Sequence, residues 1–185
     1  MAKAKQKSNR PPTIVYRLEH LYRDQHKDWV IDAIPSLIAW LKTHGSRPVV
    51  FDIRTTTSTT VSSALAIRWS LSALVKFDPG LHQRIKRASS GRTVFNEHVT
   101  EMAGYGLALV AISALLPGTR ILDKRRGLPP DLLYDITPRA IRGVEVAART
   151  NGSWGVLANL RLGAKKNGKR RNGKGPGLQK RADVA

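Results

Sequence analysis

The 185-residue chain contains no cysteine, and aromatic residues make up only 6% of it. Without cysteine there are no disulfides and no thiolate zinc sites, and the composition fits a reducing compartment. The shortage of aromatic rings gives little support to a protein that binds single strands by stacking their bases. No apolar segment follows the basic residues at the start, so no secretory signal is visible, and we expect a cytoplasmic protein.

Acidic residues are scarce as well. The chain has 13 Asp and Glu against 32 Lys and Arg, which gives a formal net charge of +19. Such an excess indicates a polyanionic partner, either nucleic acid or an acidic membrane surface. Long uncharged runs are also missing, because the longest, Met102 to Gly118, falls short of the ~20 apolar residues that span a bilayer. We therefore predict a buried core helix there and no membrane span.

The basic residues gather at the two ends of the chain. Residues 1–12 form a flexible basic arm by composition, and residues 163–185 form a disordered basic tail that is too poor in apolar side chains to fold alone. Such a tail can lie along nucleic acid, act as an address signal, or do both. The side chains of the tail predicted to bind nucleic acid are Lys165, Lys166, Lys169, Arg170 and Arg171.

Residues 13–90 are predicted to be mainly helical with one strand. Apolar residues at three- and four-residue spacing indicate a helix from Gln25 to His44, and Val49 to Ile53 resembles a compact strand. A second helix is expected to begin near Ser58 or Thr59 and to run to Lys76. Leu81 to Ala88 is a short basic helix suited to lie against phosphates. Thr13 to Leu21 fits either a strand or a helix.

Residues 91–162 combine one long helix with three strand-like runs. The helix, Arg92 to Leu116, is apolar almost all round beyond its first turns, as in a helix buried in the middle of a domain. We expect the strands to form a small mixed sheet against it, with Thr137 to Arg142 as a link. The strands are Thr119 to Asp123, Pro130 to Ile136 and Gly143 to Arg149.

The order of acids in this second region resembles the PD-(D/E)XK nuclease superfamily. The resemblance covers Thr93 to Leu160 and depends on Glu101, on Pro130-Asp131 and on Glu145-Val146-Ala147. It implies a restriction endonuclease-like α/β core with an N-terminal helical extension, in which Asp131 and Glu145 bind Mg²⁺ or Mn²⁺ and Glu101 assists. Carboxylates on neighbouring strands also suit a hard divalent cation on general grounds.

The chain departs from the superfamily at its lysine, because Ala147 stands in that position. Arg149, two residues further on the same strand face, can supply a positive charge, although Arg and Lys are not equivalent. Ala147 is either natural or an engineered knockout. Nearby, Lys124, Arg125 and Arg126 are expected to hold phosphates next to the metal.

Three functions follow from these patterns. The first is a Mg²⁺-dependent endonuclease that acts on DNA rather than RNA. The second is a catalytically inactive nuclease-fold module that binds DNA or RNA, and the third is a basic scaffold protein of a nucleoprotein assembly. Homodimerisation or a protein partner is left open. A Pro-Asp turn that merely enters a strand is the structural alternative to the metal site.

Overall fold

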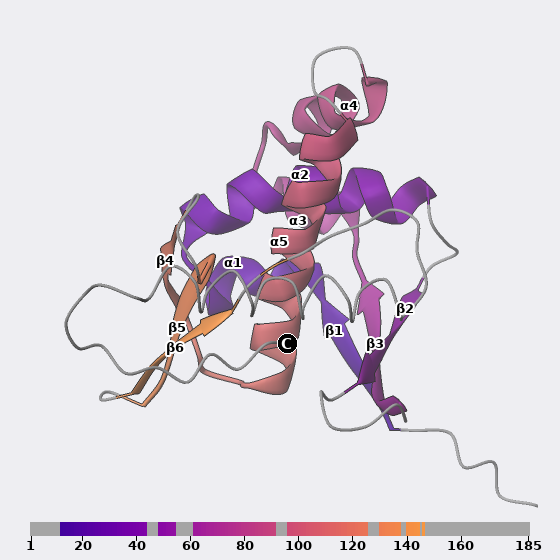
Figure 1. The fold of residues 1–185 in the computed structure, drawn as a ribbon. Helices are drawn as coiled ribbons and strands as arrows, with labels where there is room; N and C mark the ends of the chain where they lie inside the picture. Colours follow the sequence, from indigo (N-terminus) through magenta and orange to yellow (C-terminus); the bar gives the residue numbers. More distant parts are fainter. Residues whose placement is uncertain are drawn as a thin grey trace, which may run out of the picture.

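The computed structural model describes residues 12–43, 48–54, 61–91, 96–125, 130–137, 140–144 and 146. They form two small sheets with helices packed between and around them (Figure 1). The predicted α/β class, with small sheets flanked by helices, is confirmed. The flexible arm, the basic tail, Arg126, Glu145, Ala147 and Arg149 lie outside the described residues.

The first sheet is mixed and has the order β1-β3-β2. Strand β1 (Thr13–Arg17) runs parallel to β3 (Val61–Arg68), and β2 (Val49–Arg54) runs antiparallel to β3. The central strand is apolar on both faces, since Leu65 and Ile67 are buried on one face and Ala64 and Ala66 on the other. The sequence of Thr13 to Leu21 fitted either a strand or a helix. The structure shows strand β1, which continues into a 3₁₀ helix, Leu18–His20.

Two predictions for residues 13–90 are wrong. The segment contains three strands instead of one, and the helix expected from Ser58 is strand β3 over Val61–Arg68. The error has a physical cause: Val61, Leu65 and Trp69 fit a helical spacing, but a strand that is buried on both faces is apolar without any clear period. Periodicity alone therefore does not separate the two structures here.

The helices agree better with the sequence. Helix α2 (Lys27–Thr43) contains Pro35 and still runs as one element, and α5 (Asn96–Leu115) corresponds to the long apolar helix. The two cross closely at Gly106, where a β-carbon would lie 3.0 Å from Leu37 Cβ. The shorter helices are α1 (Leu21–Asp24), α3 (Leu71–Val75) and α4 (Leu81–Ser90).

The second sheet is an antiparallel meander, β4-β5-β6, and not the mixed sheet expected for these strands. Its strands are β4 (Ile121–Lys124), β5 (Leu132–Thr137) and β6 (Ala140–Val144). The link expected from Thr137 to Arg142 is wrong, because β5 includes Thr137 and β6 already begins at Ala140. The strand expected at Gly143 to Arg149 thus begins three residues earlier than predicted.

One hydrophobic core joins the regions on both sides of residue 90. Tyr16 of β1, Leu37 of α2, Leu109 of α5 and Tyr134 of β5 belong to the same buried cluster. Among the described residues, α5 is the helix long and apolar enough to cross a bilayer, and 56% of its apolar window is buried. This is the burial expected of a core helix.

Candidate functional site

Asp131 lies directly before β5 and is half-buried. Its carboxylate Oδ2 accepts a hydrogen bond from the Val146 backbone N–H at 2.7 Å. Its carbonyl oxygen accepts from the Arg125 N–H, also at 2.7 Å. Asp131 is therefore held between the end of β4 and the chain that leaves β6. Oδ1 makes no hydrogen bond within the described part of the chain.

Pro130 fixes the same corner of the sheet from the other side. Its ring lies against the α-carbon of Gly143, where an added β-carbon would be 2.1 Å from Pro130 Cγ. Only glycine allows this approach, because real β-carbons do not come so close to another atom. Pro130 and Asp131 together thus fasten the start of β5 to β6. The Pro-Asp pair has a structural role here whether or not a metal binds.

Glu101 and Glu145 are the acids expected to complete a metal site with Asp131. Glu101 is on α5 and exposed, and Glu145 lies outside the described residues together with Arg149. Within the described ranges no group of three or more His, Asp and Glu side chains could hold a metal ion. Asp131 fits a hard cation in its chemistry, since an oxygen donor suits Mg²⁺.

The basic turn after β4 is more closely packed than its sequence suggests. Lys124 Nζ lies 4.7 Å from the ring centroid of Tyr105 and 3.9 Å from Met102 Sδ, so this half-buried lysine packs against α5. Such a cation–π contact stabilises the docking of β4. Arg125 Nε lies 3.2 Å from Asp123 Oδ2 and stays exposed. Lys124, one of the three residues expected to contact phosphates, therefore also stabilises the packing of β4 against α5.

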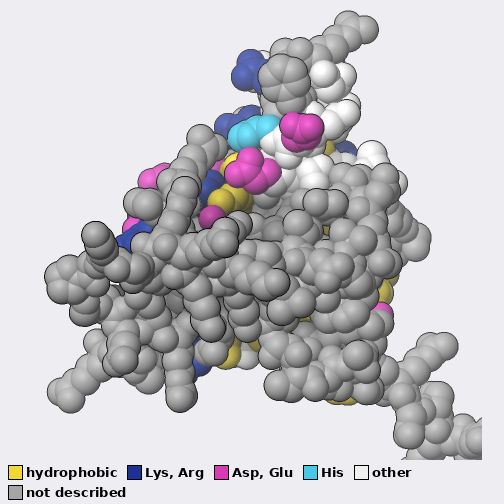
Figure 2. Space-filling model, viewed as in Figure 1, with side chains coloured by type: hydrophobic (Ala, Val, Ile, Leu, Met, Phe, Trp, Pro, Cys, Tyr) yellow, Lys and Arg dark blue, Asp and Glu magenta, His cyan; other side chains and the backbone are white. Residues whose placement is uncertain are grey.

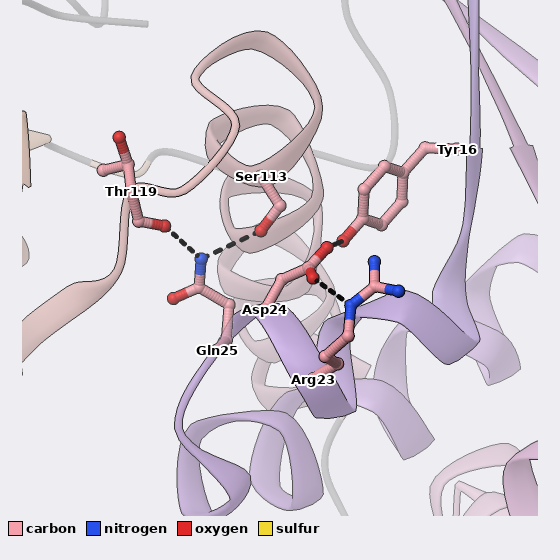
Figure 3. A network of polar contacts seen from close by, with 6 residues as sticks. All are labelled: Tyr16, Arg23, Asp24, Gln25, Ser113 and Thr119. Atoms are coloured by element: carbon pink, nitrogen blue, oxygen red, sulfur yellow. Dashed lines mark hydrogen bonds and ion pairs between the residues drawn. The ribbon is translucent and has the colours of Figure 1, made fainter.

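Sequence reasoning missed the buried polar residue at the centre of the fold, Gln25 (Figure 3). Its Nε2 donates to Ser113 Oγ and to the Thr119 carbonyl, each at 2.9 Å. Its Oε1 accepts from the Ile121 N–H, also at 2.9 Å. One side chain between α1 and α2 thereby holds the end of α5 and the start of β4. No local pattern marks Gln25, because all its partners are distant in sequence.

Tyr16 forms a second polar contact close to this network (Figure 3). Its hydroxyl donates to Asp24 Oδ2 at 2.8 Å, and Asp24 Oδ1 pairs with Arg23 Nε at 2.9 Å. Burial, and then the hydrogen bond to Asp24, raise the pKa of Tyr16 above its ordinary value. Tyr16 therefore stays protonated at physiological pH and donates a structural hydrogen bond to Asp24.

An ion pair to a buried aspartate anchors α4. Asp78, which is only 4% exposed, pairs with Arg84 of α4. Tyr22 lies beside them and stacks on Phe77, with ring centroids 5.1 Å apart. Burial, and then the negative charge of Asp78, raise the pKa of Tyr22. Within the basic helix Leu81 to Ala88, Arg84 thus pairs with Asp78 in the fold.

Of the acids expected at the nuclease site, the described residues thus include Asp131 and Glu101, while Glu145 lies outside them. The remaining members stay predictions. Comparison of the chain with protein-family profiles, with curated proteins and with solved structures gave no match.

Proposed function

We propose that this protein binds nucleic acid, mainly through contacts between its Lys and Arg side chains and the phosphate backbone. The observation that supports this most is the net charge of +19. Lys and Arg that neutralise phosphates release condensed counterions, which provides affinity without sequence preference. Function as the basic component of a nucleoprotein assembly is included in this proposal.

The positive charge is distributed unevenly along the chain. The described residues contain 14 Lys and Arg against 11 Asp and Glu, so they contribute only +3 of the +19. On the face shown in Figure 2, their basic side chains alternate with acidic ones and form no single basic patch. Most of the phosphate affinity is therefore expected from the segments rich in Lys and Arg, above all residues 1–10 and 163–185.

A salt titration tests this proposal. Binding of a labelled DNA duplex is measured between low and physiological salt for the full chain and for a variant in which the eight Lys and Arg of residues 163–185 are replaced by Gln. Each phosphate contact contributes about 0.9 to the slope of log K against log salt. If half of these side chains contact phosphates, the slope falls by roughly 4.

A variant with the same tail residues in scrambled order is the control. It should keep both affinity and slope, because counterion release depends on charge and not on order. Unchanged affinity and slope after the Gln replacement would show that the tail does not contact phosphates. Absence of binding by the full chain to DNA and RNA alike would contradict the proposal.

A second function, a Mg²⁺- or Mn²⁺-dependent phosphodiesterase acting on DNA, is favoured by the position of Asp131. One oxygen of its carboxylate accepts from the Val146 N–H, and Glu145 directly precedes Val146 in the sequence. In this proposal Asp131 and Glu145 hold the metal, with Glu101 assisting and Arg149 contributing a positive charge. The metal would activate water and stabilise the charge that develops on the phosphate.

Cleavage of labelled DNA and RNA with Mg²⁺, with Mn²⁺ and with a chelator tests this function. Asp131→Asn is the informative variant, since its amide oxygen still accepts from the Val146 N–H while the ligand charge is gone. We expect loss of cleavage with an unchanged melting temperature. Arg149→Ala should also abolish cleavage, whereas Ala147→Lys should retain or raise it. Cleavage that persists in Asp131→Asn combined with Glu145→Gln would exclude this site.

A further inference from the structure

Helix α4 is firmly attached to the fold along one side. Leu81, Ile85 and Ala88 are buried, and Ala88 belongs to a small apolar cluster with Ala39 of α2 and Val99 of α5. Arg84 adds the ion pair to the buried Asp78. A helix held by both apolar and ionic contacts keeps one orientation, so its opposite side is presented to solvent in a fixed geometry.

The solvent side of α4 has an unusual composition. It contains only hydrogen-bonding side chains, without an acid or a large apolar residue. Its exposed members are His82, Gln83, Lys86, Arg87, Ser89 and Ser90. No Asp or Glu occurs in the sequence between Asp78 and Glu97, and the charge of Asp78 is already used by Arg84. The solvent side of α4 therefore carries positive charge and no acid of its own, although the described residues as a whole are close to neutral.

The helical spacing defines the centre of this side. Gln83, Lys86 and Ser90 follow one another at three- and four-residue steps and therefore form one line along the helix. Arg87 and His82 flank this line. Figure 1 places α4 at one extremity of the molecule, far from the meander β4-β5-β6, so a rod-like ligand can approach it.

We propose that α4 enters the major groove of duplex DNA, with Gln83 at base edges and with Lys86 and Arg87 at bases or phosphates. This inference rests on the proposed nucleic-acid binding and adds a sequence-selective surface to it. The major groove of B-form DNA admits an α-helix, and Gln and Arg form bidentate hydrogen bonds with adenine and guanine. The deep, narrow major groove of an RNA duplex does not accept a helix, so the ligand is DNA.

The experiment begins with selection of duplexes from a random library by the full chain. A helix of this length should enrich a motif of roughly 3–5 base pairs, as single recognition helices do. Binding to the selected duplex, to a scrambled duplex and to an RNA duplex of the same sequence is then compared. The variants are Gln83→Ala, Lys86→Gln and, as a matched control, Lys27→Gln, whose exposed lysine lies at the opposite end of α2 from Ala39.

Gln83→Ala should weaken binding to the selected duplex about 5- to 100-fold, because the variant loses one bidentate hydrogen-bonded contact with a base. It should leave the salt slope and binding to the scrambled duplex unchanged, because no charge is altered. Lys86→Gln should lower the slope by about 1. Lys27→Gln should change neither affinity nor slope. Equal melting temperatures confirm that each variant is folded.

Two results would overturn the inference while leaving the proposed function intact. One is tail-dependent binding with no enriched motif. The other is a Gln83→Ala effect that is absent, or equal for selected, scrambled and RNA duplexes. Failure of the full chain to bind any nucleic acid would instead remove the proposed function, and the role of α4 with it.

Discussion

Replacement of Gln25 should destabilise the fold more than any single substitution on its surface. The side chain is 4% exposed and makes three hydrogen bonds of 2.9 Å, two of them to the backbone of Thr119 and Ile121. In Gln25→Leu, the Thr119 carbonyl and the Ile121 N–H lose their partner inside the protein. Each unsatisfied buried group costs about 1–3 kcal/mol.

The net loss of unfolding free energy for Gln25→Leu is expected to be about 2–4 kcal/mol. It is smaller than the sum of the two penalties, because the leucine gains some apolar burial. Urea denaturation followed by tryptophan fluorescence measures this difference, since the chain has four Trp. A variant as stable as the wild type would refute the stabilising role of the network.

Gln25→Glu separates hydrogen bonding from size. Its carboxylate can accept from the Ile121 N–H, but its other oxygen faces the Thr119 carbonyl and has no proton to donate. Burial and this repulsion raise the pKa of the introduced carboxyl above the ordinary value of about 4.3. A raised pKa in the folded state means that stability is present below the unfolded pKa and is lost as pH rises through the folded pKa.

Relative to the wild type, Gln25→Glu should therefore be least destabilised near pH 4 and should lose up to about 1.4 kcal/mol per pH unit above it. Gln25→Leu is the control, because its difference from the wild type contains no new titrating group. Parallel pH profiles for Gln25→Glu and the wild type would show that the side chain is not buried against the Thr119 carbonyl.

Gly143→Ala should destabilise the meander by about 1–3 kcal/mol, because the new β-carbon overlaps the Pro130 ring. Urea denaturation measures this loss of stability. Adding Pro130→Gly to the same chain should restore part of the stability. Gly106→Ala should cost about 1 kcal/mol, since tight contact with α2 outweighs the better helix propensity of alanine, and a gain in melting temperature would contradict this close crossing. Stability should fall as pH rises above about 10, because an unfolded tyrosine ionises there while the pKa of Tyr22 is raised in the fold. Tyr22→Phe should flatten this alkaline decline, and an unchanged alkaline profile would contradict the effect of its burial beside Asp78.

The sequence by itself determined helices α2, α4 and α5 within a few residues of their observed limits. The apolar stripe of α2 and the long apolar run of α5 are both local properties of one segment. The charge excess and the absence of thiol chemistry were determined in the same way, since composition needs no coordinates.

Tertiary structure alone decided the identity of β3. Leu65 and Ile67 on one face and Ala64 and Ala66 on the other are buried, so the sequence pattern of Val61–Arg68 has no period that identifies a strand. The pairing of β1 with β3 also joins residues just over fifty positions apart along the chain, for example Thr13 with Ala64. Contacts of this kind arise only when the chain between them has folded.

The candidate site shows the same division. The sequence located Pro130-Asp131 at the start of a strand, which is a local signal, but the partners of these residues depend on strand register. Register brings Gly143 under the Pro130 ring and the Val146 N–H to the Asp131 carboxylate. Likewise, Arg84 and Lys124 appeared in the sequence as surplus charges, and only packing directed one to Asp78 and the other to the Tyr105 ring. The role of a charged side chain depends on which groups it contacts, and those contacts exist only in the folded chain.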